Sequence, residues 1–421
     1  DRVRTSVMRS NFNSLLQPIT QGWKVLLTCR TQYFRDHDAE IKLLGSVESA
    51  KESEGNLRQH LPPRLGTQVT YLQSFTDQQI QAYLGKARPV TAGEDWQAIS
   101  AIYNLKELAQ RPYLLELIVK SLPTLRSGER INAASLYNIY TDRWIEREER
   151  KGRLLDRQTK LGLMMELAWL LWSGHRETIH CDKFMRWIER LSGSVLLSRD
   201  EEDTWDIVRE LEAASFLKRD RAGNFSFVHP SYGEYFLARK LYQALTDSDD
   251  ALTKALAIPQ RYDWRIAFFL TCLDEERHRY EPLRRILTAP YQPYVSENAL
   301  QLLYWSARAA CQMETEIRDF AVLAEEMQRA LPRGAQLVGA NLQGCELSGL
   351  VLPEADWRAA DLSGANLTRA RLRDGNFREA HLHEASFAAA DLHGSDFRGA
   401  RRHETAVWHN ASGEFLIDPL P

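Results

Sequence analysis

The sequence predicts a multidomain chain with an α/β part, a mostly α middle and a C-terminal β-solenoid. Residues 335–399 repeat every five residues, and a continuously apolar run at residues 24–30 suits a strand of a parallel sheet. The long stretch between these two segments follows a helical pattern. At 421 residues the chain is also too long for one hydrophobic core. From length alone we expect about three or four domains.

The five-residue repeat runs through thirteen copies without a slip. The residue two places before each large apolar position is Ala, Cys, Gly or Ser, with Leu350 as the exception. A helix needs an apolar spacing of about 3.6 and a strand a spacing of about 2, so a period of five fits a chain that turns a corner in every repeat. Four sides close a square coil, and coils stack about 4.8 Å apart. The large apolar positions are Leu337, Leu342, Leu347, Leu352, Trp357, Leu362, Leu367, Leu372, Phe377, Leu382, Phe387, Leu392 and Phe397.

This pattern resembles the pentapeptide-repeat family, most clearly in the segment ADLSGANLTRARLRDGNFREAHLHEASF. The resemblance implies a right-handed quadrilateral β-helix whose large and small repeat positions both face a narrow interior. We expect the solenoid to end near Ala400, because the next apolar slot holds Arg402 and a charge cannot enter a dry interior. Val407 and Trp408 would then cap the open end.

Composition and charge describe an ordinary water-soluble chain. Charged residues make up 26% and the net charge is −3, which gives no basic field for nucleic acid or membrane. The five cysteines are scattered without CxxC spacing, so a reducing cytoplasm fits better than disulfides or a zinc site. The longest apolar stretch, residues 161–172, is too short to span a bilayer and contains Glu166, which favours a buried helix. We expect a cytoplasmic protein without a membrane partner.

The first two hundred and fifty residues contain several start signals for strands and helices. Residues 24–30 and 68–72 are candidate strands, and Thr76 with Gln79 has capping-box spacing at the start of a helical pattern that continues to residue 153. Further helices precede two short strands around the turn residues 221–224, which is typical of the wing of a winged helix. Ser231 and Glu234 have capping-box spacing for the next helix.

Five strings stand in an order that resembles the back half of a NACHT module, which belongs to the STAND class of signal-transducing ATPases. They are KVLLTCRTQYF, YLQSFTDQQIQAYL, ELAQRPYLLELIV, LYNIYTDRWIERE and FVHPSYGEYFLARKL. STAND proteins use repeat domains of the present kind as sensors. The implied domains are a remnant of a parallel-sheet P-loop NTPase domain (1–75), a helical domain (76–153), a winged helix (154–245), a second helical domain (246–331), the pentapeptide-repeat β-helix with its cap (332–412) and a tail (413–421).

Three residues of these strings are candidate nucleotide contacts, and no catalytic or metal-binding residue is predicted. Arg30 lies just past the carboxyl end of a candidate strand, where a guanidinium can fork onto phosphate oxygens. The resemblance implies that Arg30 senses the terminal phosphate, that Pro112 packs on adenine, and that His229 contacts the β-phosphate of ADP. From the residues alone, each has a structural alternative: an arginine paired with a surface carboxylate, a proline in a first helical turn, and a satisfied structural histidine.

The motifs that hold phosphate and magnesium in this class are missing from the sequence. There is no GxxxxGK[ST] string, and no apolar strand that ends in paired acidic residues precedes Lys24. The simplest interpretation is that the chain is the C-terminal part of a larger ATPase that binds ADP or ATP with Mg; a naturally degenerate protein is the alternative. We expect this chain alone neither to hydrolyse ATP nor to bind it tightly.

The resemblance implies a nucleotide-controlled switch, closed with ADP and oligomeric with ATP, in bacterial antiphage defence or signalling. A protein trigger would bind the repeats or the helical region, and the protein would self-associate on activation. One alternative is a DNA-mimicking repeat protein, but residues 335–400 hold nine Asp or Glu against six Arg, a difference of −3, which is too mixed. The other is a DNA-reading winged helix, but the helix after Ser231 begins with Glu234, Tyr235 and Phe236. We therefore do not expect a nucleic-acid partner.

Overall fold

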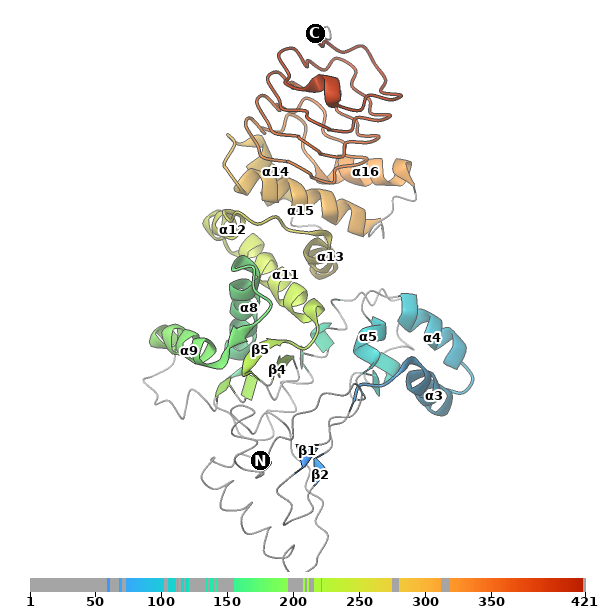
Figure 1. Ribbon diagram of the computed structural model, residues 1–421, viewed down its shortest axis with the longest axis vertical. Coiled ribbons are helices and arrows are strands. Elements are labelled where there is room, and N and C mark those ends of the chain that lie inside the picture. Colours follow the sequence, from blue (N-terminus) through green and yellow to red (C-terminus); the bar gives the residue numbers. More distant parts are fainter. Residues whose placement is uncertain are drawn as a thin grey trace, which may run out of the picture. The chain divides into compact units, whose positions relative to one another are not determined.

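A computed structural model gives the fold of the chain (Figure 1). It describes residues 73–101, 105–110, 155–195, 216–220, 222–274, 280–311 and 319–418, together with isolated positions within 59–69, 112–142 and 207–211. The chain divides into two compact units, residues 1–233 and 234–421. The described part is mostly helical, with a small sheet and the C-terminal solenoid. The candidate strand at residues 24–30 lies outside the described residues.

The described part of the first unit includes three short helices near residue 100. These are α3 (Asp77–Ala87), α4 (Ala92–Ala101) and α5 (Leu105–Ala109). The predicted capping box is confirmed, because Thr76 Oγ1 accepts the amide of Gln79 at 3.3 Å and Gln79 Oε1 accepts the amide of Thr76 at 2.8 Å. This exchange satisfies amides that a helix start leaves without intrahelical acceptors.

A three-stranded antiparallel sheet and two longer helices follow. The elements are α8 (Arg157–Ser173), β3 (Ile179–His180), α9 (Cys181–Val195), β4 (Leu217–Arg219) and β5 (Asn224–Phe227). The spatial strand order is β3-β5-β4, so β4 and β5 form the predicted hairpin. Gly223 has φ +82° in its turn, a conformation that favours glycine. The predicted buried helix at residues 161–172 is part of α8.

A second, smaller strand pair lies earlier in the chain. It consists of β1 (Gln59–His60) and β2 (Gln68–Val69), which pair antiparallel. β2 coincides with the start of the candidate strand at residues 68–72. Its described partner, β1, runs antiparallel to it. Among the residues that the structure describes, β2 is therefore not part of the expected parallel sheet.

Helices continue through the predicted region 246–331. α11 (Pro230–Asp247) leads into this region and crosses the division between the units. The helices of the second unit are α12 (Asp249–Leu256), α13 (Trp264–Leu273), α14 (Tyr280–Thr288), α15 (Val295–Ala310) and α16 (Phe320–Ala330). α15 packs against α12, α13, α14 and α16. Nearly all of its side chains are buried, including polar ones such as Glu297 and Arg308.

The repeats form a four-sided coil. Parallel bridges join residues twenty positions apart, such as Gln336 with Asp356 and Asp356 with Asn376, so four repeats make one turn, as predicted. All thirteen large apolar positions are fully buried. Three of them form a ring stack in the interior, with centroids 5.5 Å apart for Trp357 and Phe377 and 4.4 Å apart for Phe377 and Phe397. Each five-residue repeat therefore places one large apolar side chain in the interior of the coil.

Each corner of the coil is a tight turn. The amide of Ala340 donates to the carbonyl of Leu337 at 3.1 Å, and the intervening Gly339 has φ +74°. This is the pattern of a type II turn. All thirteen corner residues equivalent to Gly339 have φ between +54° and +75°, and six of them are glycine. The other seven accept a left-handed conformation without glycine.

Helices of the same unit cover the first coil of the solenoid (Figure 1). The coil would otherwise expose a row of backbone groups. Instead, side chains and carbonyls of the helical layer meet them. The amide of Gln336 donates to Leu287 O at 2.7 Å, the amide of Asn341 to Glu297 Oε1 at 3.1 Å, the hydroxyl of Tyr304 to Ser348 O at 3.0 Å, and Arg261 Nη1 to Gln343 O at 2.7 Å.

The solenoid continues beyond Ala400, contrary to the expected end. Arg402 does not enter the interior: it is exposed, with φ +55°, and the 3₁₀ helix His403–Thr405 follows it. Pairing then resumes at Val407, which bridges Ser386 twenty-one residues earlier, and runs on to Leu416. One extra residue therefore excludes the charge from the interior and lets an irregular coil form above the last regular one.

Trp408 covers the apolar interior at this end, as predicted. Its ring stacks on Phe387 with centroids 4.8 Å apart and meets the edge of Phe397 at 5.1 Å. Phe415 adds a further ring at 5.8 Å from Trp408. Val407 does not share this role, because it occupies an outward bridging position and is 47% exposed.

Candidate functional site

His229 lies at the junction between β5 and α11, in the first unit. The helix begins at Pro230, so His229 is the residue immediately before it. The amide of Ser231 donates to His229 Nδ1 at 3.2 Å, and the amide of Tyr232 donates to the His229 carbonyl at 3.1 Å. His229 therefore caps the helix with its own ring, accepting an amide that has no intrahelical acceptor.

The contacts of His229 define its tautomer. Because a backbone amide can only donate, Nδ1 carries the lone pair and the neutral ring carries its proton on Nε2. The hydroxyl of Ser231 lies 2.6 Å from the same Nδ1 and donates to it. The hydroxyl of Tyr137 in turn bonds to Ser231 Oγ, and both of these side chains are buried. A buried chain of hydrogen bonds thus orients the imidazole.

The predicted capping role of Ser231 is wrong. Its side chain points to His229 and Tyr137 rather than back to the helix amides. Proline suits the first helical position because its missing N–H is one that no helix residue would accept. With Pro230 in that place, the cap moves one residue earlier, to His229.

The other two predicted nucleotide contacts receive no test from the structure. Pro112 is in helical conformation and exposed. Arg30 lies outside the described residues. The nucleotide site made of Arg30, Pro112 and His229 stays a prediction.

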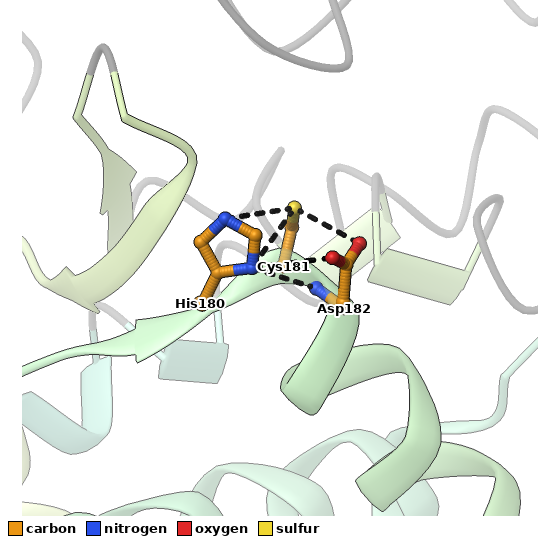
Figure 2. Close-up of side chains that lie close together, drawn as sticks. All are labelled: His180, Cys181 and Asp182. Carbon is orange, nitrogen blue, oxygen red and sulfur yellow. Dashed lines mark hydrogen bonds and ion pairs between the residues drawn. The ribbon is translucent and has the colours of Figure 1, made fainter.

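A cluster of potential metal ligands, which the sequence analysis missed, lies where β3 passes into α9. Figure 2 shows the side chains of His180, Cys181 and Asp182 turned toward one another. Their ligand atoms lie within 4.8 Å of one another, with Cys181 Sγ 3.8 Å from His180 Nδ1 and 3.6 Å from Asp182 Oδ1. Nitrogen, sulfur and oxygen donors of this kind suit a cation such as Zn²⁺.

The contacts of this cluster also have a structural explanation. The amide of Asp182, in the first turn of α9, points at His180 Nδ1 at 3.4 Å. The amide of Cys181 donates to Gly223 O at 2.9 Å, so the turn of the hairpin covers the thiol. Cys181 as a whole is only 5% exposed. The three consecutive residues make an incomplete donor set for a four-coordinate site. They join the hairpin to the start of α9.

Several acidic side chains of the solenoid pair with arginines. Arg358 bonds Asp356 and Arg398 bonds Asp396, each through two guanidinium nitrogens. The bonds from Arg398 hold the pKa of Asp396 below its ordinary value. A DNA mimic requires rows of uncompensated carboxylates, so this surface does not favour that alternative.

Among its described residues, α11 does not present a DNA-reading face. In α11, Tyr235, Phe236 and Leu241 are fully buried or nearly so. Base readout requires polar and basic side chains that can reach a groove. One face of α11 is therefore part of the apolar core, as the sequence indicated.

Comparison with known proteins identifies the C-terminal region. The family described as pentapeptide repeats matches residues 335–374 and 365–401 in eight copies. This confirms that the C-terminal region is a pentapeptide-repeat domain.

An uncharacterized WD repeat-containing protein of Nostoc sp. strain PCC 7120 is 30% identical over 241 residues, which are 57% of this chain and 15% of that protein. The chain therefore spans a small part of the length of this relative.

Two solved structures with similarity to the chain are pentapeptide repeat proteins. One comes from the thylakoid lumen of Arabidopsis thaliana: it is 19% identical, has a TM-score of 0.14, and the match covers 20% of this chain and 64% of that one. Another is HetL, involved in heterocyst differentiation regulation in the cyanobacterium Nostoc sp. strain PCC 7120. It is 22% identical, with a TM-score of 0.12, and the match covers 19% of this chain and 58% of that one.

No helix among the described residues is long and apolar enough to cross a membrane.

Proposed function

We propose that this chain is the sensor and regulatory part of a STAND-class signalling switch. In this proposal the protein that carries it is closed with ADP and self-associates with ATP, in bacterial antiphage defence or a related pathway. The hairpin of β4 and β5 with α11 would be the winged helix, and the pentapeptide repeats would recognise a protein trigger. The order of the five sequence strings and the terminal repeat domain support the assignment.

The geometry of His229 carries the proposal furthest. Its Nδ1 accepts hydrogen bonds from Ser231, so Nε2 holds the proton and is the atom that would donate to a phosphate oxygen. The buried hydroxyls of Tyr137 and Ser231 orient the ring through its Nδ1 side. A preoriented donor loses less entropy when it binds an anion than a mobile one. A histidine that only caps the helix would make the same Nδ1 contacts. The nucleotide role differs from this structural role only in that Nε2 would donate a hydrogen bond to a phosphate oxygen.

Nucleotide binding is expected to depend mainly on residues that this chain does not contain. In its 421 residues there is no GxxxxGK[ST] motif, so a phosphate cradle is missing, and no residue set fits magnesium in the way the class requires. His229 would add one charge-assisted hydrogen bond, about 1.5–3 kcal/mol. Association costs about 4–15 kcal/mol. The chain alone should therefore show no ATP turnover above that of a heat-inactivated control.

The test uses the complete gene product that carries this sequence. Removal of His229 should weaken the closed state and leave the fold intact. The loss of about 1.5–3 kcal/mol would raise the open population by about one to two orders of magnitude. We expect His229→Ala to self-associate without a trigger in multi-angle light scattering, while its melting temperature stays within a few degrees of the wild type.

His393→Ala is a matched control, because His393 is exposed on the solenoid and far from α11 in sequence. It should remain in the resting state. If His229→Ala folds normally and stays in the resting state until triggered, the histidine does not restrain the switch. If it unfolds, His229 is only a helix cap.

A further inference from the structure

A cavity of about 200 Å³ lies where α16 meets one corner of the solenoid, within the second unit. Phe320 from the first turn of α16 forms one wall, and Arg369 and Arg371, from either side of Ala370 in a single repeat, form another. Ala389 lies one coil above Arg369. The cavity therefore combines an aromatic ring, small side chains and two guanidinium groups.

The small residues produce this cavity. Gly349, Arg369 and Ala389 occupy the same corner in three successive coils, all with positive φ. The residues below and above Arg369 project little or no side chain. This leaves a trough in which the guanidinium of Arg369 lies over the ring of Phe320, 4.5 Å from its centroid. A cation over an aromatic face at this distance is held in place but keeps its N–H groups available.

The two guanidinium groups have no carboxylate partner in the described part of the chain. The Arg371 side chain makes no hydrogen bond or ion pair there, and the Arg369 side chain has only its contact with the ring of Phe320. The acidic residue in the wall, Asp391, accepts Arg373 Nε at 2.6 Å and points its other oxygen at the amide of His393 at 3.4 Å. The cavity thus presents positive charge that its own carboxylate does not neutralise.

We propose that this cavity binds a carboxylate side chain from an acidic segment of a partner protein. Arg369 and Arg371 would hold the carboxylate, since the planar guanidinium matches its two oxygens. Phe320 and the neighbouring alanines would contact the apolar atoms of the segment. The assignment rests on the protein-recognition role proposed above for the repeats, and it gives that role a site and a chemistry.

Two observations favour an acidic protein segment over other anions. The cavity is smaller than the roughly 300–1,000 Å³ of most small-molecule sites, so it suits one or two projecting side chains. Residues 335–400 carry nine acidic side chains against six arginines, a difference of −3. Such a domain repels a long polyanion such as nucleic acid, whereas a single carboxylate responds mainly to the two nearby arginines.

The experiment measures binding of a fluorescein-labelled peptide to the 421-residue chain by fluorescence anisotropy. The peptide has eight residues, with two glutamates flanking a leucine in a Gly-Ser background; a second peptide carries glutamine in place of glutamate. We expect Arg371→Gln and Arg369→Gln each to weaken binding of the glutamate peptide about tenfold or more. Arg378→Gln removes an exposed repeat arginine outside the cavity and should change binding less than about twofold.

The proposal is overturned if the glutamate peptide does not bind, if the glutamine peptide binds equally well, or if Arg378→Gln weakens binding as much as Arg371→Gln. Binding of a twelve-residue oligothymidylate with the same dependence on Arg371 would assign the cavity to nucleic acid instead. Circular dichroism must show that both cavity variants keep the wild-type fold; if they do not, Phe320→Leu should weaken binding in their place. Nucleotide-dependent self-association of the complete protein is measured separately, so loss of peptide binding with assembly intact removes only this assignment.

Discussion

Gly349 should be far less replaceable than Gly339, although both occupy equivalent positions at two corners of the first coil. Their φ values are +70° and +74°, so alanine at either position costs about 1–2 kcal/mol for the left-handed conformation. Seven other corners carry non-glycine residues at similar φ, which shows that the solenoid accepts this cost. The two glycines differ in what surrounds them.

A Cβ at Gly349 would lie 2.9 Å from Leu323 Cδ2 and 3.1 Å from Phe320 Cδ1, whereas a Cβ at Gly339 would have no atom within 4 Å. Overpacking of this kind costs about 1–3 kcal/mol. We therefore expect Gly339→Ala to lower the free energy of unfolding by about 1–2 kcal/mol and Gly349→Ala by about 2–5 kcal/mol.

Urea unfolding of the wild type and both variants, followed by circular dichroism and tryptophan fluorescence, measures the difference. Each variant's midpoint is compared at the wild-type slope, since a change of slope would signal loss of cooperativity. Equal destabilisation by the two alanines would refute the argument, because it would mean that α16 does not approach the corner as closely as described.

Three further predictions concern other parts of the chain. Tyr137→Phe removes the donor to Ser231 and should lower the free energy of unfolding by about 1–2 kcal/mol in a thermal melt, and an unchanged melt would contradict the buried hydrogen-bond chain. Trp408→Gln uncovers the apolar end of the solenoid, so light scattering should show more self-association while the β-signal in circular dichroism stays; no increase would count against the cap. Burial raises the pKa of the Cys345 thiol from its ordinary value of 9.0 to about 11. The unfolded chain therefore loses this proton first, and stability should fall by up to about 2–3 kcal/mol from pH 9 to pH 11. Cys345→Ala should show a shallower decline over that range, and an identical decline would contradict it.

The solenoid could be predicted because each repeat meets the same environment. In a strictly periodic sequence every repeat folds in the same way, so Leu337 and Phe397 are buried for the same reason. The cap of α3 was predictable for a related reason, since Thr76 and Gln79 interact within four residues of chain. The last coil was not, because its path depends on where one extra residue is placed after Arg402.

The cluster at the start of α9 could not be predicted from metal-ligand spacings such as CxxC. Three consecutive residues in a strand alternate between faces. His180 ends β3 and Cys181 begins α9, so the backbone changes conformation between them and turns all three side chains together. Similarly, the role of Ser231 depends on Tyr137, which lies 94 residues away in the sequence. Both features come from tertiary contacts that local patterns do not contain.

The twenty-residue turn of the coil has a consequence for changes in its length. Because each face is built from residues twenty positions apart, an insertion or deletion of twenty residues keeps every later side chain on its own face. A change of five residues also preserves the buried positions, but it moves each later residue to the adjacent face. Arg371 and Asp391, which share a face, would then be a quarter turn apart if five residues were inserted between them. Relatives that differ by single repeats can therefore share an identical core and yet display unrelated surfaces.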